Sequence, residues 1–314
     1  MATVKMKKNK VLITTSKFAE FDNSPLELLE ANNFEYKLNP LERKLTKKEL
    51  LSLQPSYNCL LAGLEILDEE IFKSSKFDVI SRVGTGMNNV DLVAAKKFDI
   101  SVYNTPLGPT QSVAEITVAS LLSLLRKIPQ ANNDLHNGKW KKVYGNLLYQ
   151  KDILFIGYGN IAKKVHDLIR PFDVCVHIYD PFLKNDFSSD VHFYSDLSNV
   201  LPKVDIISIH SSSEVEIISK NEYDQMKEGV YILNSSRGEV LNESLLENYL
   251  KNGKIAGAWL DVFCDEPYNG NLVNYKNVIL TPHIGSYSFE GRTFMETSAV
   301  ENLINHFKKN ANDK

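Results

Sequence analysis

The amino-acid sequence predicts an α/β protein built from two doubly wound parallel sheets. Three observations support this fold class. The chain has 314 residues, enough for two domains at roughly 150 residues each. Short apolar runs alternate with amphipathic stretches along most of its length, which is the pattern of repeated strand–helix units. The apolar runs are also continuous, as expected for parallel strands that are buried on both faces.

In the first third of the chain, apolar runs predict strands and the sequence between them predicts helices. Ser24 is expected to cap a helix that has Pro25 at its first position. The expected strands are residues 11–14, 59–62, 79–83 and 100–103, and further helices are expected at 68–73 and 90–97.

A second sheet is expected to begin after residue 150. Its expected strands are residues 153–156, 175–179, 206–209, 230–233, 255–259 and 278–280, with a helix at 163–169 after the first of them. The last helix is expected at 289–307, because Ala299, Leu303 and Phe307 recur at helical spacing.

Composition and charge exclude several classes of protein. The chain has 36 basic and 39 acidic residues, a net charge of −3, which predicts no electrostatic surface for nucleic acid. The longest nearly apolar stretch, residues 116–125, is too short for a bilayer, which takes about 20 residues. No signal-peptide core follows the basic N-terminus. We therefore expect a soluble cytoplasmic protein without nucleic-acid or membrane partners.

The three cysteines, Cys59, Cys175 and Cys264, lie far apart in the sequence. An odd number without metal-ligand spacing excludes a disulfide scaffold and a zinc finger, and it fits a compartment where thiols stay reduced. Cys59 and Cys175 lie in apolar runs and are expected to pack in the core. The sequence therefore predicts no metal site.

A glycine-containing turn follows the apolar run at 153–156. It has the form Gly157-x-Gly159-x-x-Ala162 and opens a predicted helix. In such a turn the first glycine permits the tight bend, the second lets a pyrophosphate approach, and the small third residue allows helix–strand packing. Asp180 ends the next strand, where an acidic residue binds ribose hydroxyls and repels a 2′-phosphate. This arrangement predicts a dinucleotide site that prefers NAD to NADP.

Polar residues follow three later predicted strands. Arg237 lies in the segment 234–238, Glu266 in 260–267 and His283 in 281–285. Ligands of open parallel sheets bind outside the carboxyl ends of the strands, so we expect these loops to converge there. An arginine binds a carboxylate with two parallel hydrogen bonds. A histidine paired with a glutamate exchanges a proton with a hydroxyl or carbonyl group.

Several motifs occur in an order that is typical of one family. Besides the glycine turn, they are Ser81-Arg82-Val83-Gly84-Thr85-Gly86, Asn104-Thr105-Pro106, Ser112-Val113-Ala114-Glu115 and Pro282-His283-Ile284-Gly285-Ser286. With them the chain resembles the D-isomer-specific 2-hydroxyacid dehydrogenases, and most closely their phosphoglycerate dehydrogenase branch. Because only a short tail follows Phe307, the resemblance is to a short form without a regulatory domain.

The resemblance implies a Rossmann NAD-binding domain inserted into a flavodoxin-like substrate domain. The substrate domain would comprise residues 1–107 and 287–314, and the NAD-binding domain residues 108–286. The resemblance also implies a homodimer in which the region 109–126 packs against its mate, although an apolar helix there would equally suit the interior of one chain.

The resemblance further implies roles for individual residues. Arg237 would bind the substrate carboxylate, His283 would be the acid/base and Glu266 would support it. Asp261 would bind the nicotinamide amide, and His210 would line the adenine side. The residues expected to bind the cofactor are Gly157, Gly159, Asn160, Ile161, Asp180, His210, Ser236, Asp261 and Gly285. Those expected to bind the substrate are Gly84, Thr85, Gly86 and Arg237.

The implied activity is hydride transfer between NAD and a D-2-hydroxy acid, with 3-phosphoglycerate as the best single substrate. Residues 62–65 carry no basic residue where some phosphoglycerate dehydrogenases have one. Reduction of hydroxypyruvate, glyoxylate or 2-oxoglutarate therefore remains open, as does an NAD-sensing protein of the same fold. Formate dehydrogenase fits poorly, because that branch has Gln in place of Glu266.

Overall fold

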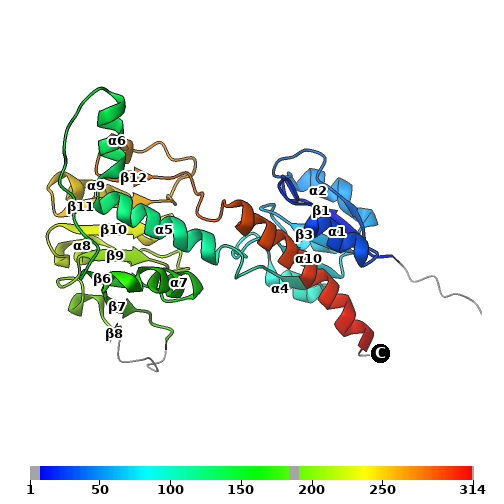
Figure 1. Cartoon of the computed structure of the whole chain (residues 1–314). Helices are drawn as coiled ribbons and strands as arrows, with labels where there is room; N and C mark the ends of the chain where they lie inside the picture. Colours follow the sequence, from blue (N-terminus) through cyan, green and yellow to red (C-terminus); the bar gives the residue numbers. More distant parts are fainter. Residues whose placement is uncertain (1–7, 184–190, 313–314) are drawn as a thin grey trace, which may run out of the picture. The chain divides into compact units, whose positions relative to one another are not determined.

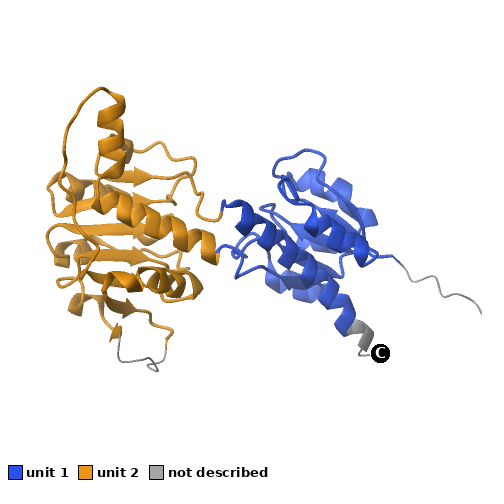
Figure 2. Cartoon of the chain, viewed as in Figure 1, with its two compact units in different colours: residues 1–109, 287–314 blue, residues 110–286 orange. Residues whose placement is uncertain are grey.

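The computed structural model describes residues 8–183 and 191–312, which fold as two compact units. Unit 1 comprises residues 1–109 and 287–314, and unit 2 comprises residues 110–286 (Figure 2). The sequence analysis places the first boundary after residue 107, whereas the contacts place it after Pro109. Each unit has its own parallel sheet and its own hydrophobic core.

Unit 1 contains a five-stranded parallel sheet with the order β2-β1-β3-β4-β5, which is the flavodoxin-like order. Its strands are β1 (Lys10–Ile13), β2 (Glu35–Lys37), β3 (Cys59–Ala62), β4 (Val79–Arg82) and β5 (Ser101–Tyr103). Helices cover both faces. They are α1 (Ser24–Ala31), α2 (Lys47–Leu53), α3 (Glu69–Ser74), α4 (Leu92–Lys97) and α10 (Phe289–Asn312).

The two faces of this sheet carry separate cores. Leu29 of α1 and Leu303 of α10 pack against one face, so the two ends of the chain are joined in one core. Figure 1 shows α10 (red) beside the blue N-terminal elements of unit 1. Leu50 of α2 and Phe72 of α3 pack against the other face. Continuous apolar strands are therefore buried on both sides, as the sequence predicts.

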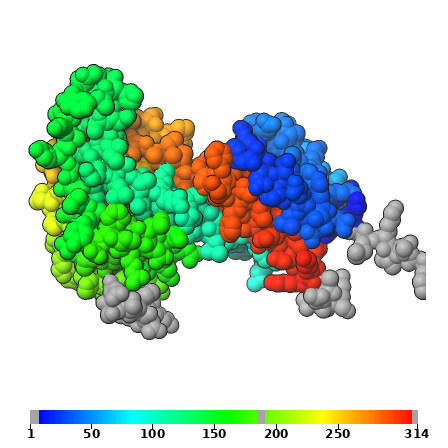
Figure 3. All heavy atoms as spheres, in the orientation of Figure 1, coloured from blue at the N-terminus to red at the C-terminus, as the bar shows by residue number. Residues whose placement is uncertain are grey.

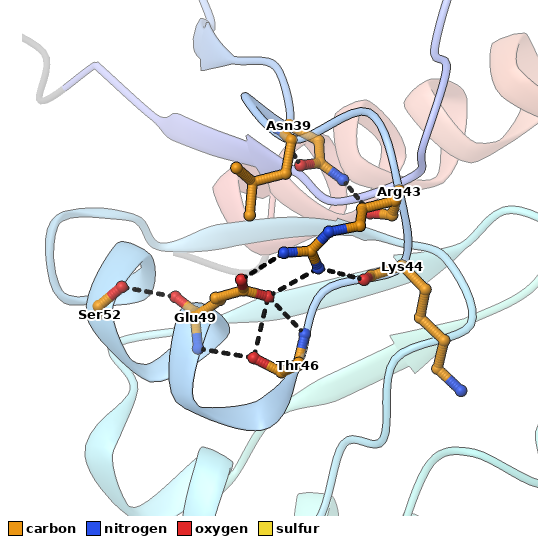
Figure 4. A network of polar contacts seen from close by, with 7 residues as sticks. Asn39, Arg43, Lys44, Thr46, Glu49 and Ser52 are labelled. Carbon is orange, nitrogen blue, oxygen red and sulfur yellow. Dashed lines mark hydrogen bonds and ion pairs between the residues drawn. The ribbon is translucent and has the colours of Figure 1, made fainter.

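Side chains fix where the helices of unit 1 begin. Thr46 and Glu49 form a reciprocal capping box at the start of α2, and Arg43 adds an ion pair of 2.6 Å to Glu49 (Figure 4). Hydrogen bonding to Arg43 lowers the pKa of Glu49 to about 2. For α1 the sequence expectation is wrong by one residue: Asn23 is the N-cap and Ser24 is already helical.

Unit 2 contains a seven-stranded parallel sheet with the order β12-β11-β10-β9-β6-β7-β8. Numbered from β6, this is the 3-2-1-4-5-6 order of a Rossmann fold with one further strand. The strands are β6 (Asp152–Ile156), β7 (Cys175–Tyr179), β8 (Val191–Tyr194), β9 (Ile206–Ile209), β10 (Val230–Asn234), β11 (Ile255–Leu260) and β12 (Val278–Leu280). The strand order reverses between β6 and β9, which marks the expected ligand crevice.

Helices cover both faces of this second sheet as well. They are α5 (Thr110–Leu125), α7 (Asn160–Ile169), α8 (Lys220–Gln225) and α9 (Glu243–Lys251). A further helix, α6 (Ile128–His136), has no buried residue. The apolar face of α5 packs with Phe155 and Trp259 of the sheet, so much of this helix is used inside unit 2. Leu246 of α9 and Tyr223 of α8 pack in the core of the opposite face. Short 3-10 helices occur at Gln54–Ser56, Arg170–Phe172, Leu197–Asn199, Gly238–Val240 and Asn271–Asn274.

β2 and β8 are not among the expected strands. Both are edge strands in which no residue is buried, and both lack the continuous apolar run that marks the central strands and the edge strand β12. The helix expected at 163–169 begins earlier, at Asn160, because the glycine turn leads directly into it. Among the described residues, no helix combines the length and the apolar character needed to cross a membrane.

Candidate active site

The glycine turn lies at the switch point of the unit 2 sheet, between β6 and α7. Gly157 has φ +84°, and a Cβ there would lie 2.8 Å from the carbonyl oxygen of His210. A side chain is therefore excluded by both conformation and space. A Cβ on Gly159, by contrast, would meet no atom within 4 Å, so this position is open to a ligand. Ala162 is fully buried between helix and sheet.

These positions match what a dinucleotide pyrophosphate requires. Gly159 is the N-cap of α7, so the first N–H groups of the helix, at Asn160 and Ile161, have no intrahelical acceptor. A helix N-terminus with such groups attracts phosphate through both hydrogen bonding and its dipole. The residues present therefore fit the cofactor that the sequence predicts.

Asp180 lies directly after β7 and is fixed against the same turn. Its carboxylate accepts hydrogen bonds of 2.9 Å from the backbone N–H groups of Tyr158 and Phe182. The carbonyl of Tyr179 accepts a bond of 2.8 Å from the N–H of Gly157. An anion is thus held rigidly one strand away from the phosphate-binding turn, where the ribose of a bound dinucleotide is expected.

His210 follows β9 and packs against the turn from the other side. Its Nε2 lies 2.8 Å from Ser208 Oγ, and its ring is tilted against Phe155 with centroids 5.7 Å apart. Desolvation lowers the pKa of His210 from 6.5 to about 3. The ring is therefore neutral over the physiological range and adds no positive charge to the site.

Protonation of His210 is expected to destabilise the fold in acid. Unfolded His210 takes up a proton below pH 6.5, whereas the folded ring stays neutral down to about pH 3. Stability is therefore lost as the pH falls through this window, by up to about 2 kcal/mol between pH 7.5 and 5. Urea unfolding at the two pH values should show a smaller loss for His210→Gln. An identical loss in His210→Gln, with His136→Gln as control, would contradict this assignment.

The loop after β10 presents Arg237. Asn234 is fully buried, accepts hydrogen bonds from the N–H and Oγ of Ser236, and donates to the carbonyl of Arg237 at 2.8 Å. Arg237 Nη1 donates to the carbonyl of Ser236 at 2.7 Å. No role is predicted for Asn234 from the sequence. Its hydrogen bonds to Ser236 and Arg237 shape the turn that carries Arg237.

Gly238 brings this loop against the one that follows β11. A Cβ on Gly238 would lie 2.0 Å from the backbone carbon of Phe263 and 2.3 Å from the nitrogen of Cys264, so any side chain would separate the two loops. Because Glu266 lies on the second loop, the glycine keeps the segments of Arg237 and Glu266 packed together. Sequence reasoning missed this role, since nothing in the sequence shows which backbone approaches Gly238.

Glu266 and His283 form a direct pair. His283 Nδ1 lies 2.9 Å from Glu266 Oε2 and 3.2 Å from Oε1, and the N–H of Phe263 donates to Oε1 at 3.2 Å. The His283 side chain is 55% exposed and that of Glu266 39%. Within the described part of the chain, Nε2 of His283 has no hydrogen-bond partner. Glu266 thus holds Nδ1 of His283, and Nε2 is left available to a substrate.

The backbone of His283 is strained. Its φ is +53°, a left-handed conformation that few residues other than glycine adopt. Such strain persists only where the surroundings impose it, and it is concentrated at functional sites. Here the surroundings are the carboxylate of Asp261, which is buried and accepts hydrogen bonds from Ile284 N–H at 2.9 Å and Gly285 N–H at 2.7 Å. Thr281 Oγ1 donates to the same carboxylate at 2.5 Å.

Asp261 and Gly285, both expected to bind the cofactor, therefore contact each other in the structure. Their polar groups bind each other and hold the loop that carries His283. The expected contact between Asp261 and a nicotinamide amide stays a prediction, and the loop-holding role is additional to it. This role follows from the fold, because the two residues are separated by a whole strand in the sequence.

The segment Gly84–Gly86 lies in unit 1, after β4. Gly84 has φ +132°, and its N–H donates to Thr105 Oγ1 at 2.8 Å. Asn104 Nδ2 donates to the carbonyl of Thr85 at 2.7 Å. The Gly84 N–H is thus used within unit 1. The assignment of Gly84, Thr85 and Gly86 to substrate binding stays a prediction.

The family of the protein follows from comparison with known proteins. Residues 118–285 match the model of the D-isomer specific 2-hydroxyacid dehydrogenase, NAD binding domain. The chain therefore belongs to the D-isomer specific 2-hydroxyacid dehydrogenase family. Unit 2 carries the NAD-binding domain, and its cofactor is NAD(H).

Individual relatives are similar over most of this chain. It is 34% identical over 248 residues to D-3-phosphoglycerate dehydrogenase of Bacillus subtilis, covering 76% of this chain and 47% of the relative. It is 31% identical over 274 residues to that of Archaeoglobus fulgidus, covering 84% and 52%. The chain thus spans about half the length of these curated relatives. A Polaromonas structure described as a putative D-isomer specific 2-hydroxyacid dehydrogenase, 22% identical, has the same fold, with a TM-score of 0.87 over 96% of this chain and 98% of that one.

Proposed function

We propose that this protein interconverts a D-2-hydroxy acid and its 2-oxo acid with NAD(H) as hydride carrier. The observation that carries the proposal is the pair of His283 and Glu266, joined at 2.9 Å and held by the loops that follow β11 and β12. These loops lie at the carboxyl edge of the same sheet as the glycine turn.

The chain's own residues supply the proton transfer. In oxidation, His283 Nε2 removes the proton from the substrate hydroxyl, and in reduction it returns a proton to the carbonyl oxygen. Glu266 stabilises the imidazolium that forms and fixes the ring through Nδ1. When bound, NAD accepts and NADH donates the hydride. Arg237 binds the substrate carboxylate and orients C2.

The proposed substrate is 3-phosphoglycerate and its 2-oxo acid. Support comes from the names of the Bacillus and Archaeoglobus relatives, both D-3-phosphoglycerate dehydrogenases. Glu65, in the segment without a basic residue, is buried and accepts hydrogen bonds from Thr14 and Gly63. Its carboxylate is therefore withdrawn into unit 1 and is not presented against a phosphate.

The proposal is tested by the absorbance of NADH against a panel of 2-oxo acids. Turnover of 3-phosphohydroxypyruvate above hydroxypyruvate, glyoxylate, 2-oxoglutarate and pyruvate is the expected result. If only an unphosphorylated acid were turned over, the proposed hydride transfer would stand and the assignment of 3-phosphoglycerate as substrate would be wrong. NADH binding without turnover of any of the acids would favour an NAD-sensing protein.

Asp180 is expected to set the preference for NAD. Asp180→Ala should raise the dissociation constant of NADH about 10–100-fold, because hydrogen bonds between the carboxylate and the ribose are lost. It should weaken NADPH binding less or improve it, since repulsion of the 2′-phosphate disappears. Fluorescence titration with both cofactors measures this. Asp196→Ala, which likewise removes a carboxylate that accepts a backbone N–H in unit 2, is the control. Equal effects of both variants would contradict the prediction.

We also propose that the protein is a homodimer. Much of α5, the helix expected at the interface, is used inside unit 2, but the segment that follows it, residues 126–150, exposes several large apolar side chains. Leu135, Trp140, Tyr144 and Leu147 are 57%, 84%, 94% and 63% exposed. This segment, green in Figures 1 and 3, runs along the outer side of unit 2. Exposed aromatic residues at this density are typical of an interface, and we assign a second copy of the chain to it.

Light scattering is expected to give twice the chain mass of 35.6 kDa. Replacing Trp140 and Tyr144 together by glutamate should reduce it to one chain mass, because charges are then buried at the interface. Val215→Glu, at another exposed apolar residue of unit 2, should leave the dimer intact. A wild-type protein of one chain mass would refute the dimer.

A further inference from the structure

A cluster of three potential metal ligands lies at the starts of β6 and β7. Asp152 is the first residue of β6, and Cys175 and His177 are the first and third residues of β7. The two strands are parallel, with Asp152 opposite Cys175. This register places all three side chains on one face of the sheet, and one ligand atom from each lies within 4.8 Å of the others.

The distances within the cluster approach those of a tetrahedral site. His177 Nε2 lies 3.6 Å from Cys175 Sγ and 2.8 Å from Asp152 Oδ1. With Zn–S of about 2.3 Å and Zn–N and Zn–O of about 2.0 Å, a tetrahedron has S···N and N···O edges of about 3.6 and 3.3 Å. The sulfur and nitrogen are thus already at the required separation. The separation between His177 Nε2 and Asp152 Oδ1 has to widen by about half an ångström, and the Asp152 side chain is 38% exposed.

The surroundings hold His177 in the orientation that a ligand requires. Its side chain is only 6% exposed, and its Nδ1 lies 3.3 Å from the hydroxyl of Tyr194 on β8. Metal-binding histidines characteristically use the second ring nitrogen in this way, which fixes the ring and its tautomer. The ring of His192 stacks on His177 with centroids 5.3 Å apart.

The charges also suit a divalent cation. One carboxylate and one thiolate balance two positive charges. The nearby lysines Lys151 and Lys227 both pair with Asp205, at 3.7 and 2.7 Å, so neither ion pair involves Asp152. Asp205 also accepts the backbone N–H of Asp152 at 3.2 Å, which anchors the start of β6.

We propose that Asp152, Cys175 and His177 bind a divalent transition-metal ion of the Zn²⁺ type, with water in the fourth position. Binding releases the proton of the Cys175 thiol to solvent. The proton that His177 Nε2 donates to Asp152 in the metal-free protein moves to Nδ1, which then donates to the hydroxyl oxygen of Tyr194, and the Nε2 lone pair binds the metal. The ion would join β6 to β7 at the N-terminal ends of these strands, and the glycine turn follows the other end of β6. Its role is therefore structural, and the proposal does not depend on the dehydrogenase activity.

The probe for this site is Co²⁺, titrated into the metal-stripped full-length protein. One equivalent is expected to produce a near-ultraviolet thiolate charge-transfer band and the strong visible bands of tetrahedral Co²⁺, and Zn²⁺ should displace it. Cys175→Ser should abolish the charge-transfer band. Cys264→Ser, at an exposed cysteine in a different loop, should keep it.

His177→Gln should weaken Co²⁺ binding at least tenfold, while His136→Gln, at an exposed histidine of α6, should not. Thermal melting in EDTA shows whether each variant is folded, and NADH titration shows that the nucleotide site is intact. The proposal is overturned if the wild type gives no charge-transfer band, or if the band survives Cys175→Ser. In either case the cluster is a hydrogen-bonded group only.

Discussion

Replacing His283 with alanine is expected to lower kcat by about 10²–10⁴ while NADH binding stays within about twofold. The ring is the group that moves the substrate proton, and its pairing with Glu266 is the only contact that holds Nδ1 among the described residues. The glycine turn at Gly157–Ala162 follows β6, whereas His283 follows β12, so the loss of the ring should leave the nucleotide site intact. Steady-state rates with the best acid of the panel, together with NADH fluorescence titration, measure the two effects.

The control for this experiment is His136→Ala, which removes an exposed histidine from α6. It should leave kcat unchanged. If His283→Ala retained full activity, or lost activity only because NADH no longer bound, the acid/base assignment would be wrong. Glu266→Gln should give an intermediate loss of kcat, because the amide still contacts the ring but no longer stabilises its positive charge.

Replacing Arg237 with glutamine is expected to lower kcat/KM by about 10²–10³, mostly through KM, with NADH binding retained. The substrate carboxylate would lose a charged hydrogen-bonding partner. Arg237→Lys should recover only part of this loss, since an ammonium group keeps the charge but lacks the planar fork. Substrate saturation curves for the three proteins measure the effect.

A loss of structure would complicate this result, because Arg237 also donates to the carbonyl of Ser236. Asn234, however, shapes the turn independently of the guanidinium group, so both variants are expected to melt close to the wild type. Arg126→Gln, at an exposed arginine after α5, is the matched control. An unchanged KM for the acid in Arg237→Gln would show that another residue binds the carboxylate.

The central strands could be predicted because they are buried on both faces. Residues 59–62, 175–179 and 206–209 are strands in the structure with the predicted bounds. So is the edge strand at 278–280, which is apolar although it is only partly buried. Burial on both sides requires a continuous apolar run, and such a run is visible in the sequence. The edge strands β2 and β8 need no such run, and they were missed. The helix starts that the sequence predicts lie within three residues of the observed ones, since several polar residues compete for each N-cap. Helices α2, α6, α8 and α9 are not predicted.

The residues of the candidate site could be named from the sequence because their motifs occur in family order. Their contacts could not. These contacts depend on distances between segments far apart in the chain. Examples are the hydrogen bonds of Asp261 to the His283 loop, the close approach of the Phe263 backbone to Gly238, and the hydrogen bond from the Gly84 N–H to Thr105.

The sequence by itself therefore determined the fold class, the glycine turn and the residue types available for chemistry. It did so because hydrophobic periodicity and turn geometry are local properties of the chain. Only the tertiary structure decided which side chains meet. The cluster of Asp152, Cys175 and His177 is the clearest case: the sequence predicted no metal site, since cysteine spacing was the only available signal. Parallel pairing of β6 with β7 joins residues more than twenty positions apart. Strands buried on both faces show no alternation of apolar and polar residues from which their register could be predicted.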